Sequence, residues 1–165
     1  MDRIVRNLLC GTAMATVGVF GVKYVKRKIK ASENNLNRQS QYYDVLLDWI
    51  DNMQGYRRID RSLLKSGYRK IAVYGKGTLG FLLYRELMNT DVTIEYFIDQ
   101  TADEYSSNVD GIPVVKKEDI FQMEPVDAII VTPIHVYENI KKDLKCFGVE
   151  KIPIISIKET VLEAE

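Results

Sequence analysis

The chain of 165 residues contains one histidine, two cysteines and no surplus of either charge, since 23 Lys and Arg balance 23 Asp and Glu. Cys10 and Cys146 form no C-x-x-C or zinc-ligand spacing, so we expect neither a disulfide framework nor a metal site. The balanced charge argues against nucleic acid as a partner. No G-x-x-x-x-G-K-[ST] motif supports P-loop hydrolysis. The length suits one compact domain.

Charged residues are also missing from residues 7–22, and a basic cluster follows at residues 23–30. A bilayer span needs about 20 apolar residues, so this run is marginal. We predict membrane attachment through residues 1–30, either as a short span or as an interfacial helix, with a buried soluble helix as the remaining alternative. We expect no signal cleavage, because the basic cluster follows the apolar run. The positive-inside rule predicts that the rest faces the cytoplasm, with the N-terminus outside if the segment spans.

The next part of the chain is predicted to be a linker and a helical cap. Residues 31–41 are polar without apolar periodicity, which is typical of a linker. Residues 42–66 are predicted to form the cap, beginning with a helix for which Ser40 is a candidate N-cap. Its apolar stripe contains Tyr43, Leu46, Leu47, Trp49, Ile50 and Met53. We expect the stripe to pack on the following domain; contact of helix 42–53 with a protein partner or a second copy is the alternative.

Strand and helix signals alternate from residue 67 to residue 165, which predicts an α/β domain. Apolar runs predict five strands, at residues 70–75, 92–99, 112–115, 126–132 and 151–157. Proline is largely confined to edge strands and strand starts, and Pro113 and Pro153 fall in the third and fifth strands. We therefore predict a Rossmann-like, doubly wound parallel sheet with strand order 3-2-1-4-5.

A glycine-rich loop lies between the first strand and the helix that follows it. Gly75, Lys76, Gly77, Thr78, Leu79 and Gly80 form a G-x-G-x-x-G motif, the pattern of a turn that brings backbone amides to a phosphate. Asp99 ends the second strand, where a carboxylate can accept hydrogen bonds from ribose hydroxyls. No arginine follows Asp99, which favours NAD over NADP if the ligand is a dinucleotide. The alternative is that the loop serves backbone geometry alone.

The segments KIAVYGKGTLG, IEYFIDQ, DGIPVV and DAIIVT resemble small Rossmann-like domains of bacterial polysaccharide biosynthesis. These are the N-terminal domains of sugar O-acyltransferases and of membrane-bound nucleotide-sugar dehydratases, within the wider NAD(P)- or CoA-binding superfamily. The resemblance covers residues 70–157. It implies that the loop 75–80 and Asp99 line a site for NAD, a UDP-sugar or CoA. The catalytic domains of those families do not follow Glu165, so it implies an accessory or regulatory binding module.

Four side chains around the fourth strand and the helix after it are further candidates. Thr132 is a predicted N-cap of that helix, with Pro133 at its first position, and both lie at the strand edge where open α/β sheets bind ligands. His135, near the helix start, is a candidate ligand contact and a weak candidate catalyst. Tyr137 and Lys141 have the Y-x-x-x-K spacing of short-chain dehydrogenases, a spacing that Tyr24 and Lys28 repeat by chance.

These observations leave three hypotheses. The first is a membrane-associated module that binds a nucleotide or nucleotide-sugar. The second is an NAD-dependent oxidoreductase or epimerase acting on a nucleotide-sugar, with His135 or Tyr137 in catalysis. The third is a degenerate fold that serves protein contact through helix 42–53.

Overall fold

A computed structural model describes residues 2–102 and 108–165, and the burial of side chains is described from residue 24 onward. The chain divides into two compact units, residues 1–40 and 41–165. Helix α1 (Asp2–Gln54) contributes to both, and every residue from Tyr24 to Ser40 is exposed. The side chains of residues 7–22, where membrane attachment was predicted, lie outside the described surroundings. In the part of the chain that is described, no helix is both long and apolar enough for a transmembrane span.

The polar stretch 31–41 is helical, although a linker was expected there. Ser40 lies inside α1, so its prediction as an N-cap was wrong. Ala31 and Leu36 are the only apolar residues in this stretch and all of its residues are exposed, yet most of them are tolerated in an exposed helix. The boundary between the two units, after Ser40, falls near the end of the expected linker.

The second unit is built on one six-stranded sheet of order β3-β4-β2-β1-β5-β6. All neighbouring strands are parallel except β3 and β4, which are antiparallel. The prediction of an α/β fold with a largely parallel sheet is therefore confirmed. The strands are β1 (Lys70–Tyr74), β2 (Thr93–Ile98), β3 (Asn108–Val109), β4 (Ile112–Val115), β5 (Ala128–Val131) and β6 (Ile154–Ser156).

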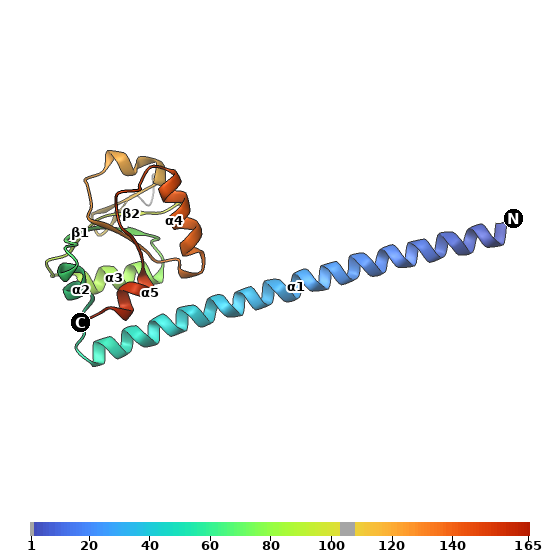
Figure 1. Cartoon of the computed structure of the whole chain (residues 1–165), viewed down its shortest axis with the longest axis horizontal. Coiled ribbons are helices and arrows are strands. Elements are labelled where there is room, and N and C mark those ends of the chain that lie inside the picture. Colours follow the sequence, from blue (N-terminus) through green and yellow to red (C-terminus); the bar gives the residue numbers. More distant parts are fainter. Residues whose placement is uncertain (1, 103–107) are drawn as a thin grey trace. The chain divides into compact units, whose positions relative to one another are not determined.

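Helices cover both faces of this sheet (Figure 1). Alternate residues of β1 point to opposite sides: Ile71 and Val73 join one apolar cluster, whereas Ala72 and Tyr74 join the other. The first cluster includes residues of α2 (Ile59–Lys65), α3 (Thr78–Leu87), α5 (Ile157–Leu162) and the end of α1. The second includes residues of α4 (Tyr137–Cys146) and of the short helix η1 (Lys117–Gln122). The core therefore has two layers, one on each side of the sheet.

The sheet has six strands and not the predicted five, because residues 108–115 form a hairpin. Asp110 and Gly111 connect β3 to β4 with φ values of 50° and 91°, and positive φ at both turn residues matches a type I′ hairpin turn. Strand β4, which contains Pro113, is therefore second from the edge, whereas the proline rule predicted it at the edge. Pro113 is tolerated there because the pairing of β4 with β2 begins only at Val114, so the missing amide falls just before that ladder.

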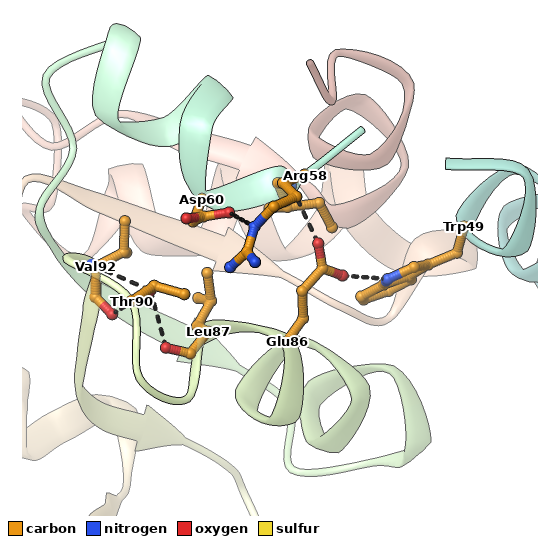
Figure 2. Close-up of polar contacts among 8 residues, drawn as sticks. Trp49, Arg58, Asp60, Glu86, Leu87, Thr90 and Val92 are labelled. Atoms are coloured by element: carbon orange, nitrogen blue, oxygen red, sulfur yellow. Dashed lines mark hydrogen bonds and ion pairs between the residues drawn. The ribbon is translucent and has the colours of Figure 1, made fainter. Parts of the chain in front are cut away.

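The end of α1 packs on the domain through only part of the predicted stripe, and through Val45, which was not in that stripe. Val45 and Trp49 are buried, but the predicted stripe residues Tyr43 and Ile50 are 67% and 50% exposed. Trp49 donates its indole N–H to Glu86 Oε2, and Glu86 Oε1 accepts the Ile59 amide at 3.0 Å (Figure 2). The prediction was right for Trp49 and wrong for Tyr43 and Ile50, because α1 is apolar over more than one face and contacts with the domain decide which face is buried.

Candidate functional site

The glycine loop follows β1 and places two backbone segments in contact. Gly75 has φ +99°, a conformation that residues with a Cβ rarely adopt, and a Cβ there would lie 2.6 Å from Thr132 Oγ1. A Cβ at Gly80 would lie 2.3 Å from the Gly75 carbonyl oxygen. The first and third glycines of the motif are therefore both needed for close packing of the loop against α3 and β5.

The N-terminus of α3 is open at the second glycine of the motif. Gly77 is the N-cap residue and has no side chain with which to cap the helix. A Cβ built there would meet no atom within 4 Å. The first amides of an α-helix have no acceptor within the helix. Gly77 and Thr78 are both exposed, so the N-terminal amides of α3 face solvent and are suited to an anion.

Asp99 lies beside the loop because β1 and β2 are neighbours in the sheet. Its Oδ2 accepts the Lys76 amide at 3.0 Å, and its Oδ1 accepts both the amide and the hydroxyl of Thr101, at 2.9 and 2.6 Å. Burial raises the pKa of Asp99, but hydrogen bonds from the Lys76 amide and from Thr101 lower it more, so the net shift is downward. The carboxylate therefore stays ionised and anchors the start of the loop.

The lowered pKa of Asp99 predicts how stability depends on pH. Asp99 stabilises the fold fully above the pKa of an unfolded aspartate, and this contribution disappears as the pH falls through the lower folded value. Thermal melts from pH 7 down to pH 2 should therefore show a smaller loss of melting temperature in Asp99→Asn than in the wild type. Equal losses in both proteins would show that the Asp99 pKa is not shifted by folding.

Thr132 closes the loop from the neighbouring strand. Its buried hydroxyl donates to the carbonyl oxygens of Tyr74 and Gly75, at 3.0 and 3.2 Å. The predicted helix start at Thr132 and Pro133 was wrong: a short 3-10 helix, η2 (Ile134–Val136), comes first, and α4 begins at Tyr137. The N-cap residue of η2 is Pro133, which makes no side-chain capping hydrogen bond, and the Thr132 hydroxyl donates to the loop carbonyls instead.

A cavity of about 490 Å³ opens at the carboxyl ends of β1, β2 and β5. Tyr74 pairs with Ile98 and Val131 in the parallel register, which brings Gly75 and Asp99 to the same edge of the sheet. The cavity is lined by Tyr74, Gly75, Asp99, Gln100, Pro133, Val136, Asn139, Ile140 and Asp143. Its size falls in the range of small-molecule sites.

Several of these lining residues were not among the sequence candidates. Tyr74 directly precedes the loop, and burial raises the pKa of its hydroxyl despite an opposing hydrogen bond with Gln100. Asn139 and Asp143 come from α4 at a spacing of four residues, which places them on one face of the helix. The position of Tyr74 at the end of β1 and of Gln100 just after β2 could have indicated them, because ligands bind at this edge of parallel sheets.

The α4 side of the cavity carries an ion pair and an aromatic pair. Lys117 Nζ lies 2.7 Å from Asp143 Oδ2 and 5.2 Å from the centre of the Phe147 ring. The hydrogen bond with Asp143 raises the pKa of Lys117. Phe121 stacks on Phe147 with ring centres 5.5 Å apart. These contacts connect η1 to α4 and fix Asp143 at the cavity.

The three weak catalytic candidates line or flank a second cavity, of about 420 Å³, which also includes Ser156 and Glu159. His135 is exposed in η2 and lines this cavity with Tyr137. Tyr137 Oη donates to the Ile154 carbonyl at 2.9 Å and accepts Lys141 Nζ at 2.9 Å. That last hydrogen bond raises the pKa of Lys141. The Tyr137 proton is engaged with β6, so this pair connects α4 to the sheet.

The part of the chain that contains the loop, Asp99, Thr132 and His135 also carries a family match. Residues 67–155 match the family described as C2185-like, N-terminal, and this segment is more than half of the chain. The chain belongs to the C2185-like N-terminal family. No curated protein was found to match it.

The C2185-like segment begins just before β1 and ends within β6. It contains η2 and α4, which contribute lining residues to both cavities. It also contains every candidate site residue named from the sequence. Helices α1 and α2 precede it. The candidate site therefore lies within the family segment. Trp49, which packs on the domain, lies before that segment.

Proposed function

We propose that the C2185-like segment is a Rossmann-like domain that binds a nucleotide or nucleotide-sugar at the glycine loop. The five parallel strands run in the order β4-β2-β1-β5-β6, which suits a doubly wound sheet of this type. The observation that carries the proposal is the open N-terminus of α3 next to a loop in which Gly75 and Gly80 leave no room for a Cβ.

The proposed phosphate site is the first turn of α3. The Lys76 amide already donates to Asp99, so the phosphate would use the amides that follow it, from Gly77 to Leu79. The exposed surface at Gly77 gives a phosphate access to these amides, and the positive end of the helix dipole favours negative charge there.

The proposed nucleoside site is the cavity of about 490 Å³ beside the loop. Asp99 Oδ1 already accepts two hydrogen bonds from Thr101, but Oδ2 accepts only the Lys76 amide, so Oδ2 can also accept a ribose hydroxyl. A 2′-phosphate would be repelled by the same carboxylate, which favours NAD, a UDP-sugar or ADP over NADP. Tyr74 and Asn139 supply polar groups for the base or the sugar.

We propose binding without catalysis as the role of this domain. Tyr137 and His135 line a different cavity from Asp99, and the Tyr137 hydroxyl is engaged with the Ile154 carbonyl. Such a module would act as an accessory or regulatory part of a larger system. We further propose that residues 1–30 hold it at the cytoplasmic face of a membrane; the uncharged run 7–22 and the basic cluster after it support this.

The test compares Gly77→Asp with Gly77→Asn. Aspartate at this N-cap position suits the helix, so the variant should fold at least as well as the wild type, but its charge repels phosphate. We expect it to weaken ligand binding about a hundredfold, or by about 2.8 kcal/mol. Asparagine has nearly the same shape without the charge and should weaken binding much less.

Thermal shift with NAD, NADP, UDP-sugars, CoA and ADP measures this effect. A ligand at a hundred times its Kd stabilises the folded state by about 2.7 kcal/mol, which raises Tm by several degrees. We expect a rise in the wild type and in Gly77→Asn, and none in Gly77→Asp. If the wild type melts cooperatively and no ligand shifts it, or if Gly77→Asp responds like the wild type, the proposed phosphate site is wrong.

A further inference from the structure

A seven-residue repeat runs along helix α1 and is used by no contact described so far. Counting from Val22, every seventh residue is apolar; these first positions, called a, are Val22, Ile29, Leu36, Tyr43 and Ile50. The fourth positions, called d, are Val25, Ser32, Gln39, Leu46 and Met53. Apolar residues fill all five a positions and three of the five d positions, whereas Ser32 and Gln39 are polar; this is the pattern of a coiled coil with a polar interruption.

The repeat leaves apolar side chains in water on both sides of the boundary between the two units. In the first unit, Val25, Ile29 and Leu36 are 53%, 53% and 63% exposed. In the second unit, Ile50 and Met53 are 50% and 68% exposed. An isolated helix is only marginally stable in water, and most helical stability comes from packing of an apolar face. None of residues 24–40 is buried, so we expect their apolar face to pack against a partner.

The face that packs on the domain is mostly a different one, although Leu46 at d is half-buried against the domain core. Val45 and Asn52 occupy the third position of their heptads, and Trp49 occupies the seventh. The domain therefore covers one side of the end of α1 and leaves Tyr43, Ile50 and Met53 uncovered. Packing on the domain and pairing through a and d are thus compatible in one helix.

We propose that α1 pairs with α1 of a second copy of this chain as a parallel, in-register, two-stranded coiled coil. A seven-residue repeat is complementary to itself, since each a residue meets the same a residue of the partner. Charge supports the same register: Lys28 is at the seventh position, called g, and Glu33 is at the fifth position, e, of the next heptad. In a parallel pair, a g residue faces the e residue that follows it on the other helix.

The residue types favour two strands. Val22, Ile29 and Ile50 are β-branched residues at a, a choice that suits dimers, while the polar Ser32 and Gln39 at d lower the stability of the pair. The second copy also accounts for an apolar groove of about 770 Å³ at the end of α1. Ile50 and Met53, which face the partner helix, line that groove with Leu82 of α3.

Two substitutions separate this face from the rest of α1. In the full chain, held in a mild detergent, light scattering behind size exclusion should give twice the protein mass of one chain. Leu36→Asp puts a charge at an a position and should give one chain, whereas Asn34→Asp, at the outer f position, should stay dimeric. Both residues are exposed, so neither change is expected to unfold the domain, and equal melting temperatures would verify that.

Cross-linking tests the register. Starting from Cys10→Ser and Cys146→Ser, Gln39→Cys places a thiol at d, and Gln41→Cys places one at f. With copper phenanthroline and oxygen as oxidant, Gln39→Cys should form a disulfide between chains at least tenfold faster than Gln41→Cys. Glu33→Lys should weaken the dimer, and Lys28→Glu combined with it should restore it.

Three results would overturn the proposal. The wild-type chain could have the mass of one chain at micromolar concentration, or of three. Leu36→Asp could remain as dimeric as Asn34→Asp, which would assign association to another surface such as residues 7–22. The two cysteine variants could also cross-link equally fast, which would exclude an in-register parallel pair.

Discussion

Replacing Gly80 with alanine is expected to lower the free energy of unfolding by about 3 kcal/mol. The new Cβ would lie 2.3 Å from the carbonyl oxygen of Gly75, and backbone cannot rotate away as a flexible side chain can. Movement of α3 is restricted as well, because the Phe97 ring lies 3.7 Å from the same point. The loop and the helix would have to separate, which opens the core around Leu79 and Leu83.

Urea denaturation followed by far-UV circular dichroism measures this loss. Gly77→Ala is the matched control, because it makes the same chemical change in the same loop at a position with open space and ordinary φ. We expect it to cost less than about 1 kcal/mol, the usual effect of an unfavourable N-cap residue. If Gly80→Ala were as stable as Gly77→Ala, the Gly75 carbonyl would not lie as close to α3 as the structure places it.

Replacing Trp49 with alanine is expected to cost about 4 kcal/mol, the largest effect of any single change before the family segment. The Trp49 side chain is 5% exposed and belongs to the same apolar cluster as Ile59 and Val161. Its removal leaves a cavity and also removes the hydrogen bond to Glu86 (Figure 2). The Glu86 carboxylate would keep the hydrogen bond that it accepts from the Ile59 amide.

Trp49→Phe separates these two contributions. Phenylalanine keeps most of the apolar contact but donates no hydrogen bond, so we expect a loss of about 1 to 2 kcal/mol. Asp44→Ala, an exposed change on the same helix, should leave stability within about 0.5 kcal/mol of the wild type. If Trp49→Ala melts like Asp44→Ala, the end of α1 does not pack on the domain in solution.

Much of the candidate site was predictable because its signals are local. The G-x-G-x-x-G spacing places a turn between a strand and a helix, and the structure gives Gly75 and Gly80 the close backbone contacts that such a turn requires. The end of the second strand brought Asp99 to the loop, since neighbouring parallel strands end at the same edge. The hydrogen bond from the Lys76 amide to Asp99 could not be predicted, because it joins residues 23 positions apart in the sequence.

The signals that failed were local ones with two readings. The Asp110–Gly111 pair predicts a hairpin turn, but the strand before it has only two residues and carries little pattern of its own. The Tyr137 and Lys141 spacing predicted a pair, and the side chains do meet at 2.9 Å, yet the Ile154 carbonyl takes the Tyr137 proton. Residue spacing shows which groups can meet but not which third group competes for them.

The sequence by itself determined the α/β class, the glycine turn and the helix at residues 42–53, because these follow from periodicity and backbone preference within a few residues. Only the tertiary structure decided which side of α1 is buried. Tyr43 and Trp49 are both aromatic residues on one amphipathic helix, yet one is 67% exposed and the other 5%. The difference arises because residues distant in the sequence surround Trp49: Glu86 accepts its hydrogen bond, and Ile59 and Val161 belong to the same apolar cluster.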